Sequence, residues 1–122
     1  MPRAVRALRG ATTVDADTPE QIHERVTALL NEMWARNDVH HDDLISILFT
    51  VTDDIVSCFP ATAARTIGLG DVPLMCAREI PVPGSMPRCV RVLVHLESDK
   101  ARRELHHVYL ENAKGLRDDL PE

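Results

Sequence analysis

Residues 72–94 read VPLMCAREIPVPGSMPRCVRVLV, and this stretch decides the fold. Two apolar runs flank a segment rich in proline and glycine, which is the pattern of two strands joined by a loop. We expect these runs to form the central pair of strands in a sheet. In the second run every other residue is apolar, which predicts one fully buried face. That face comprises Val90, Val92, Val94 and Leu96.

The opposite face of the second run carries a charge. Arg91 stands there between Cys89, Leu93 and His95, and Glu79 stands at the end of the first run. A charge among apolar side chains is costly unless an opposite charge meets it. The simplest interpretation is an internal ion pair between Arg91 and Glu79. We favour a pocket for an anionic ligand, because further arginines converge from elsewhere in the chain.

The composition predicts one domain over residues 1–122 and narrows the class of partner. The net charge of −5 argues against nucleic acid or an anionic membrane as the main partner. Lysine occurs only at positions 100 and 114, and the other twelve basic residues are arginines. The planar guanidinium suits carboxylates better than an ammonium group does. Small anionic molecules are therefore the favoured ligands.

The compartment is also constrained by the sequence. The three cysteines, Cys58, Cys76 and Cys89, are odd in number and widely spaced, which argues against a secreted disulfide scaffold. Arginines interrupt the apolar residues near the N-terminus, so no secretory signal is predicted. No apolar run approaches the length of a membrane span. We expect a cytoplasmic protein.

The first half of the chain predicts a strand, a long helix and a second strand. Residues 3–10 favour a short strand, with Gly10 permitting a turn. Thr18 is expected to cap a helix from Pro19 to about Arg36, with Gln21 completing a capping box. Residues 37–43 (NDVHHDD) are expected to be a solvated connection, because adjacent histidines rarely share one metal ion. The apolar residues 44–52 predict a buried strand.

The second half adds short elements around the central stretch. A slim helix is expected at residues 60–67, ended by Gly68. Asp99 is expected to cap a brief helical segment at residues 100–105, and residues 107–110 predict a last strand. The tail, about 115–122, is expected to be mobile.

Together these elements predict an α+β fold. Its five-stranded mixed sheet is covered on one face by one long helix and short helices. The other face, with Arg91, would stay uncovered in one chain, and an oligomer is the simplest way to cover it.

Five separated segments, in order, carry a family resemblance. They are residues 9–13 (RGATT), 59–61 (FPA), 73–79 (PLMCARE), 89–92 (CVRV) and 107–111 (HVYLE). This pattern closely resembles the monofunctional, trimeric α/β class of chorismate mutase, the AroH class, from about Val5 to Leu120. The resemblance implies a homotrimeric pseudo-barrel with sites between subunits. It also implies a Claisen rearrangement of chorismate to prephenate, in phenylalanine and tyrosine biosynthesis, without a cofactor or metal.

The resemblance also implies roles for individual residues. The catalytic group comprises Arg91 against the breaking ether oxygen, Glu79 at the ring hydroxyl and Arg9 at a carboxylate. The wider set of substrate-binding residues comprises Arg9, Phe59, Arg65, Met75, Cys76, Ala77, Arg78, Glu79, Arg91, Tyr109, Leu116 and Arg117. Two positions depart from the family, which often has a basic residue in place of Thr62 and a threonine in place of Met75.

Strand geometry independently favours a shared site. Cys76 and Glu79 are three residues apart, so in a regular strand their side chains lie on opposite faces. Two neighbouring subunits could each give one face to a common pocket. Alternatives remain: an enamine/imine deaminase of the RidA type, a trimeric module that binds a regulatory carboxylate, and an enzyme that uses Cys76 as a nucleophile. No base is assigned to that thiol, so a small buried polar role is favoured for it.

Overall fold

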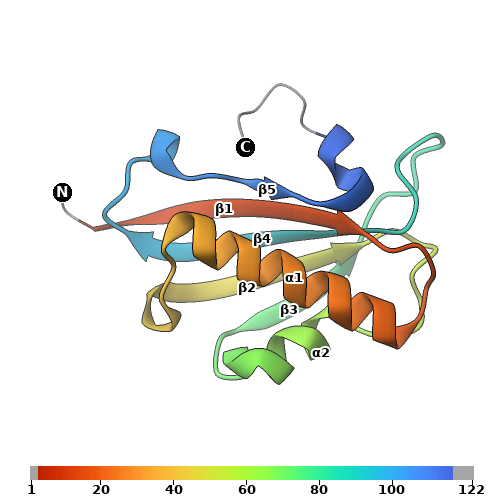
Figure 1. Ribbon diagram of the computed structural model, residues 1–122, viewed down its shortest axis with the longest axis horizontal. Helices are drawn as coiled ribbons and strands as arrows, with labels where there is room; N and C mark the ends of the chain where they lie inside the picture. Colours follow the sequence, from red (N-terminus) through yellow and green to blue (C-terminus); the bar gives the residue numbers. More distant parts are fainter. Residues whose placement is uncertain (1–2, 117–122) are drawn as a thin grey trace.

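The computed structural model describes residues 3–116 as a five-stranded mixed sheet with its two α-helices on one face (Figure 1). The strands are β1 (Ala4–Thr13), β2 (Leu44–Val51), β3 (Leu74–Arg78), β4 (Cys89–Ser98) and β5 (Val108–Tyr109). The α-helices are α1 (Pro19–Asn37) and α2 (Pro60–Ala64). Short 3-10 helices are η1 (His41–Asp43), η3 (Arg102–Glu104) and η4 (Glu111–Gly115), and a π-helical turn, η2 (Arg65–Leu69), continues α2. The predicted α+β class and mixed sheet are confirmed.

The strand order is β3-β2-β4-β1-β5, so the predicted central pair is only half right. β4 is central and pairs antiparallel with β1 and β2, whereas β3 lies at the edge and pairs parallel with β2. β2 therefore separates the two strands of the opening stretch. The ten residues between β3 and β4 are long enough to cross that intervening strand, because neighbouring strands are only about 4.8 Å apart.

The core lies between the sheet and α1. The predicted alternation of β4 is confirmed, since Val90, Val92, Val94 and Leu96 are all buried. The apolar face of α1 covers them, and its buried members are Ile22, Val26, Leu29, Leu30 and Met33. Phe49 of β2 is also fully buried. Helix α1 therefore serves as core cover, as its periodicity predicts.

Only one of the two hydrogen bonds of the predicted capping box is present at the start of α1. The Gln21 amide donates to Thr18 Oγ1 at 3.2 Å. The Gln21 side chain does not return to the Thr18 amide, because its carbonyl oxygen accepts instead from the amides of Ala16, at 2.9 Å, and Asp15. This correction has a simple cause: the Thr18 amide already donates to Ala16 O.

Gly10 does not make a turn, because β1 runs three residues further than predicted, to Thr13. A Cβ atom added to Gly10 would lie 2.5 Å from Met33 Sδ and 3.2 Å from Leu29 Cδ1. The close approach of α1 to β1 therefore favours glycine, because a larger residue would force the end of the Met33 side chain to shift.

The short segments differ from prediction in detail. Residues 41–43 form η1 inside the expected connection. η3 begins after Ala101, whose amide donates to Glu104 Oε1 at 2.7 Å, so Asp99 is not its cap. The helix predicted at residues 60–67 is α-helical only to Ala64 and continues as η2, in which the backbone loses its helical conformation at Ile67 and at Gly68, where φ is 94°. Most of the tail, residues 117–122, lies outside the described residues.

Candidate active site

The sheet face away from α1 carries a cavity of about 280 Å³. We call it the arginine pocket, and its lining comprises Arg9, Gly10, Ala11, Leu48, Thr50, Glu79, Arg91, Val92, Leu93 and Tyr109. These residues come from β1, β2, β4 and β5 and from the residue after β3. Sequence reasoning named four of them as site residues, and the structure brings those four together: Arg9, Glu79, Arg91 and Tyr109.

The alternation of β4 places Arg91 on the sheet face away from α1, which we call the open face. Pairing with a strand on each side holds its backbone there. Its register partners are Thr50 of β2 and Ala11 of β1. Arg91 Nε lies 3.4 Å from Glu79 Oε2, so the simpler interpretation, an internal ion pair, also describes the geometry. That nitrogen is buried and makes no hydrogen bond within residues 3–116. The pair therefore leaves a buried donor of Arg91 for a ligand.

Glu79 is held from a second side by a residue that sequence reasoning missed. Thr50 Oγ1 donates a hydrogen bond to Glu79 Oε2, and Glu79 N donates to Val51 O at 2.8 Å. These bonds orient the carboxylate immediately after β3 ends. The alternate face of β2 carries two polar residues, Ser46 and Thr50, but the strand's own sequence does not show which other strand becomes their neighbour.

Tyr109 reaches the same pocket from β5. Its ring packs in a small apolar cluster with Ala11, Cys89 and Ala113, and Leu116 packs against that cluster. The Tyr109 hydroxyl is buried, and the described part of the chain gives it no hydrogen-bond partner. An unpaired buried hydroxyl is costly, and a polar ligand in the pocket would supply its partner.

Arg9 lies on β1 at the pocket wall. Its backbone amide donates to His107 Nδ1 at 3.0 Å, which ties this part of β1 to the segment leading into β5. The guanidinium groups of Arg9 and Arg91 thus line one cavity together with a single carboxylate, that of Glu79. These three groups leave a net positive charge, so the lining favours a small anion.

A second cavity, of about 320 Å³, opens around the loop between β2 and α2. We call it the phenylalanine pocket, and its lining comprises Val51, Ile55, Val56, Ser57, Cys58, Phe59, Pro60, Cys76, Ala77 and Arg78. Cys76 pairs in register with buried Phe49, so its side chain lies on the core side of β3, away from Glu79. The predicted opposition of Cys76 and Glu79 is therefore confirmed. Of the two phenylalanines in the chain, Phe49 is buried in the core, whereas Phe59 is 69% exposed.

Of the predicted residues in the described part of the chain, Arg65, Met75 and Leu116 lie in neither pocket. Arg65 is exposed where α2 passes into η2, and Met75 is 67% exposed on β3. Arg117 lies outside the described residues. Thr62, where the family pattern differs, is exposed on α2.

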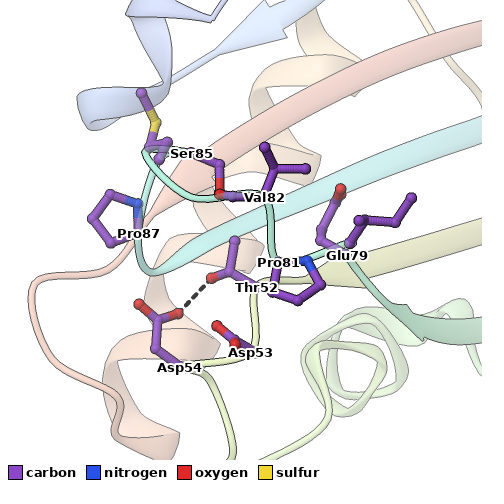
Figure 2. Close-up of a pocket in the computed structure, with 10 residues that line it drawn as sticks. Thr52, Asp53, Asp54, Glu79, Pro81, Val82, Ser85 and Pro87 are labelled. Carbon is purple, nitrogen blue, oxygen red and sulfur yellow. Dashed lines mark hydrogen bonds between the residues drawn. The ribbon is translucent and has the colours of Figure 1, made fainter.

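The beginning of β4 is fixed by an acidic loop, which Figure 2 shows beside a third pocket. Thr52 Oγ1 donates to Asp54 Oδ1 at 2.5 Å and accepts from the Cys89 amide at 3.0 Å. The Asp54 carboxylate accepts from the Arg88 amide at 2.9 Å, and this holds Arg88 in a left-handed conformation with φ of 49°. Asp53, Asp54 and Glu79 line the third pocket, so its charge is wrong for an anionic ligand.

The described residues hold no assembled metal site, and two of the three thiols are disfavoured as nucleophiles. No group of three histidine, cysteine or acidic residues within 3–116 is placed to hold a metal ion. Burial raises the pKa of the Cys58 and Cys89 thiols, which disfavours the reactive thiolate. No helix of the described chain is both long and apolar enough to cross a membrane.

A small α+β domain with two arginines, a tyrosine hydroxyl and a carboxylate around one cavity defines a protein that binds a compact organic anion. The chain belongs to the chorismate mutase type I family, which matches residues 5–120. It is 50% identical over 117 residues to the chorismate mutase AroH of Thermus thermophilus, covering 95% of this chain and 96% of that one. It is 37% identical over 117 residues to the AroH of Bacillus subtilis, covering 95% and 92%. A solved chorismate mutase from Clostridium thermocellum superposes with a TM-score of 0.87 at 48% identity, covering 88% of this chain and 96% of that one.

Proposed function

We propose that this member of the chorismate mutase family rearranges chorismate to prephenate in a site built by two neighbouring subunits of a homotrimer. Residues 1–122 form one catalytic domain, and it works in the cytoplasm. The observation that carries the proposal is the convergence of Arg9, Arg91 and Tyr109 on one cavity, where residues 3–116 give the buried Arg91 Nε and Tyr109 hydroxyl no hydrogen bond. Family membership and the identity to curated chorismate mutases support the reaction itself.

The reaction accounts for the chemistry of the pocket. In the rearrangement an ether C–O bond breaks while a C–C bond forms, and no atom enters or leaves the molecule. It needs no nucleophile, base or cofactor, only a compact substrate conformation and a cation where the ether oxygen gains negative charge. Chorismate is a dianion, which suits a pocket lined by Arg9 and Arg91 in an otherwise acidic protein.

Arg91 is the residue we assign to the ether oxygen. It stands on the central strand, between β2 and β1, so its backbone is held from both sides. A donor fixed in this way stabilises developing charge without reorganising, an effect of about 3–4 kcal/mol. An acceleration of about a millionfold requires about 8 kcal/mol, so restriction of the substrate conformation must contribute the remainder.

The neighbouring subunit supplies the opposite wall in this proposal. Phe59, Arg65, Met75, Cys76, Ala77 and Arg78 are assigned to it, and Leu116 and Arg117 to a tail that closes over the site. Two observations support the sharing. Cys76 lies on the other side of β3 from Glu79, and Phe59 is too exposed for an aromatic side chain with no neighbour.

The activity is tested by mixing the purified protein with chorismate and following the loss of its diene absorbance. Formation of prephenate supports the proposal. An unchanged spectrum with intact fold would contradict it and would favour the deaminase or the regulatory carboxylate-binding module.

The sharing of the site is tested by mixing two inactive variants. Arg91→Ala removes the arginine of one half, and Phe59→Asp places an unpaired charge in the other. After joint refolding in equal amounts, about three-quarters of the trimers are mixed and about one site in three of these has both halves intact, so about a quarter of wild-type activity should return. No recovery, with mixed trimers confirmed by mass, would place the site within one chain.

A further inference from the structure

The loop that carries Phe59 is held by a carboxylate from another part of the chain. Between the end of β2 and the start of α2 the backbone has no regular structure. Ile55 anchors it in the core, but Val56 is 74% exposed and Phe59 is 69% exposed. The Val56 amide donates to Asp17 Oδ2 at 3.0 Å, and the Ser57 amide donates to Asp17 Oδ1 at 3.2 Å.

Asp17 is well placed to transmit rigidity to this loop. It directly precedes Thr18, the cap of α1, and α1 is buried along its whole apolar face. The two oxygens of one carboxylate therefore bind consecutive amides of the loop from a fixed helix start. Hydrogen bonds from the Ser57 hydroxyl and the Val56 amide lower the pKa of Asp17, so the carboxylate is charged and the bonds are charge-assisted.

The two bonds to Asp17 act together with packing to set the position of Phe59, since Ile55 and Pro60 on either side of it are buried. Within residues 3–116 the structure records no other hydrogen bond from the Val56 or Ser57 amides. Phe59 itself is fixed on its other side, where Phe59 O accepts from Thr62 N at 3.1 Å in the first turn of α2. Asp17 thus holds the start of the short segment from Val56 to Phe59, and helix α2 holds its end.

We propose that Asp17 is a positioning residue for the phenylalanine pocket: it sets the loop at Val56 and Ser57 so that Phe59 forms the wall of the neighbouring subunit's site. This role rests on the proposed function, in which Phe59 contributes to the active site shared with the neighbouring subunit. Asp17 touches no substrate. Its loss should damage that half and leave the arginine pocket of the same subunit intact.

The direct effect is measured on the loop. In Asp17→Ala the amides of Val56 and Ser57 should exchange with deuterium faster, while those of β2 and β4 keep wild-type protection. kcat/KM for chorismate should fall about tenfold, because two charge-assisted hydrogen bonds are lost. Asp17→Asn, which keeps a carbonyl acceptor, should restore part of both. Asp53→Asn is the matched control, since the Asp53 carboxylate lies in the same loop and has no hydrogen bond recorded in the described chain, and it should behave as wild type.

The decisive readout is which inactive variant Asp17→Ala can complement. Refolded in equal amounts with Arg91→Ala, it should give about a quarter of wild-type activity, because some sites combine its intact arginine pocket with an intact phenylalanine pocket. Refolded with Phe59→Asp, it should stay near one-twentieth, because both variants damage the same half. A generally destabilised protein would not distinguish the two partners.

The mixture of Arg91→Ala with Phe59→Asp separates failure of this inference from failure of the proposed function. If that mixture regains activity but Asp17→Ala complements Phe59→Asp instead of Arg91→Ala, the role of Asp17 is overturned. Wild-type exchange at Val56 and Ser57 in Asp17→Ala would overturn it as well. If the reference mixture itself fails, the shared site is refuted and the role of Asp17 falls with it.

Discussion

Arg91 is a positive charge on a strand whose other face is buried in the core. The alternation of residues 89–96 was enough to predict the face on which it lies, because strand periodicity is local. The same reasoning found Glu79, which approaches Arg91 within 3.4 Å. It missed Thr50, which binds Glu79 from β2, because that contact depends on which strands become neighbours. The roles of Arg65 and Arg117 stay predictions.

Arg91→Lys should keep the fold and lose most activity. An ammonium group keeps the charge but not the planar, preorganised guanidinium. kcat should fall about a hundredfold or more, with a smaller change in KM, because the charge on the ether oxygen develops only in the transition state. Steady-state kinetics with chorismate measure both constants. Near-normal turnover would remove Arg91 from the assigned role, and Cys76→Ser, which keeps a small polar side chain, serves as the tolerated control.

At the scale of elements, packing between helix and sheet decided what local sequence could not. Gly10 looked like a turn residue, yet it lies inside β1 because Met33 and Leu29 of α1 approach the strand there. β3 and β4 were predicted as strands correctly, but not their separation by β2. Strand order depends on pairing energies across the whole sheet, which no short window of sequence contains.

Gly10→Ala should destabilise the protein by about 1–3 kcal/mol, because the new methyl group overpacks the contact with Met33. The free energy of unfolding in urea measures the loss. Gly70→Ala is the matched control, since Gly70 has a helical φ of −66° and nothing within 4 Å of an added Cβ. If Gly10→Ala were as stable as wild type, the Met33 side chain would have to move aside at little cost. Shortening Met33 should relieve part of the effect.

A pH-dependent link joins η1 to the loop before β3. His41 Nε2 lies 2.9 Å from Asp71 Oδ1, and the hydrogen bond with Asp71 raises the pKa of His41. A raised histidine pKa adds stability below the unfolded-state value of about 6.5, and that stability is lost as the pH rises through the folded-state value. His41→Ala should therefore lower the free energy of unfolding at about pH 5.5 and leave it almost unchanged at about pH 8.5.

The control for this link is the His41→Ala substitution in a protein that lacks the Asp71 carboxylate. Hydrogen bonding with His41 lowers the pKa of Asp71, so the link also weakens when Asp71 is protonated in acid. In an Asp71→Asn background, His41→Ala should show no pH-dependent difference in unfolding free energy. A difference that grows with rising pH would contradict the assignment.

At the scale of the whole molecule, the open sheet face and several exposed apolar side chains call for a cover. Phe59, Met75 and Ile80 are all more than half exposed, which is unusual for a small monomer. Sequence reasoning anticipated the uncovered face from the single long helix. The pseudo-barrel assembly itself stays a proposal, because one chain records only the surface that a neighbour would cover.

A homotrimer of this 13.6 kDa chain should have a native mass of about 41 kDa by light scattering. Leu93→Glu places a charged side chain on the open face, beside its register partner Arg9, and should dissociate the trimer because a neighbouring subunit would have to bury that charge. Ala28→Glu, on the exposed side of α1, is the control and should keep the mass of the wild type. A wild-type monomer would refute the trimer.

The place of β1 in the sheet has a consequence for how the chain is made. β1 leaves the ribosome before the other four described strands, but it lies between β4 and β5, and its pairing partners are 76–98 residues further along the chain. Pairings over such distances form slowly, because a long loop must close before any contact rewards it. A nascent chain stopped after Arg78 should therefore leave the β1 amides unprotected from exchange. During synthesis, the segment that carries Arg9 therefore stays unpaired until β4 has emerged from the ribosome.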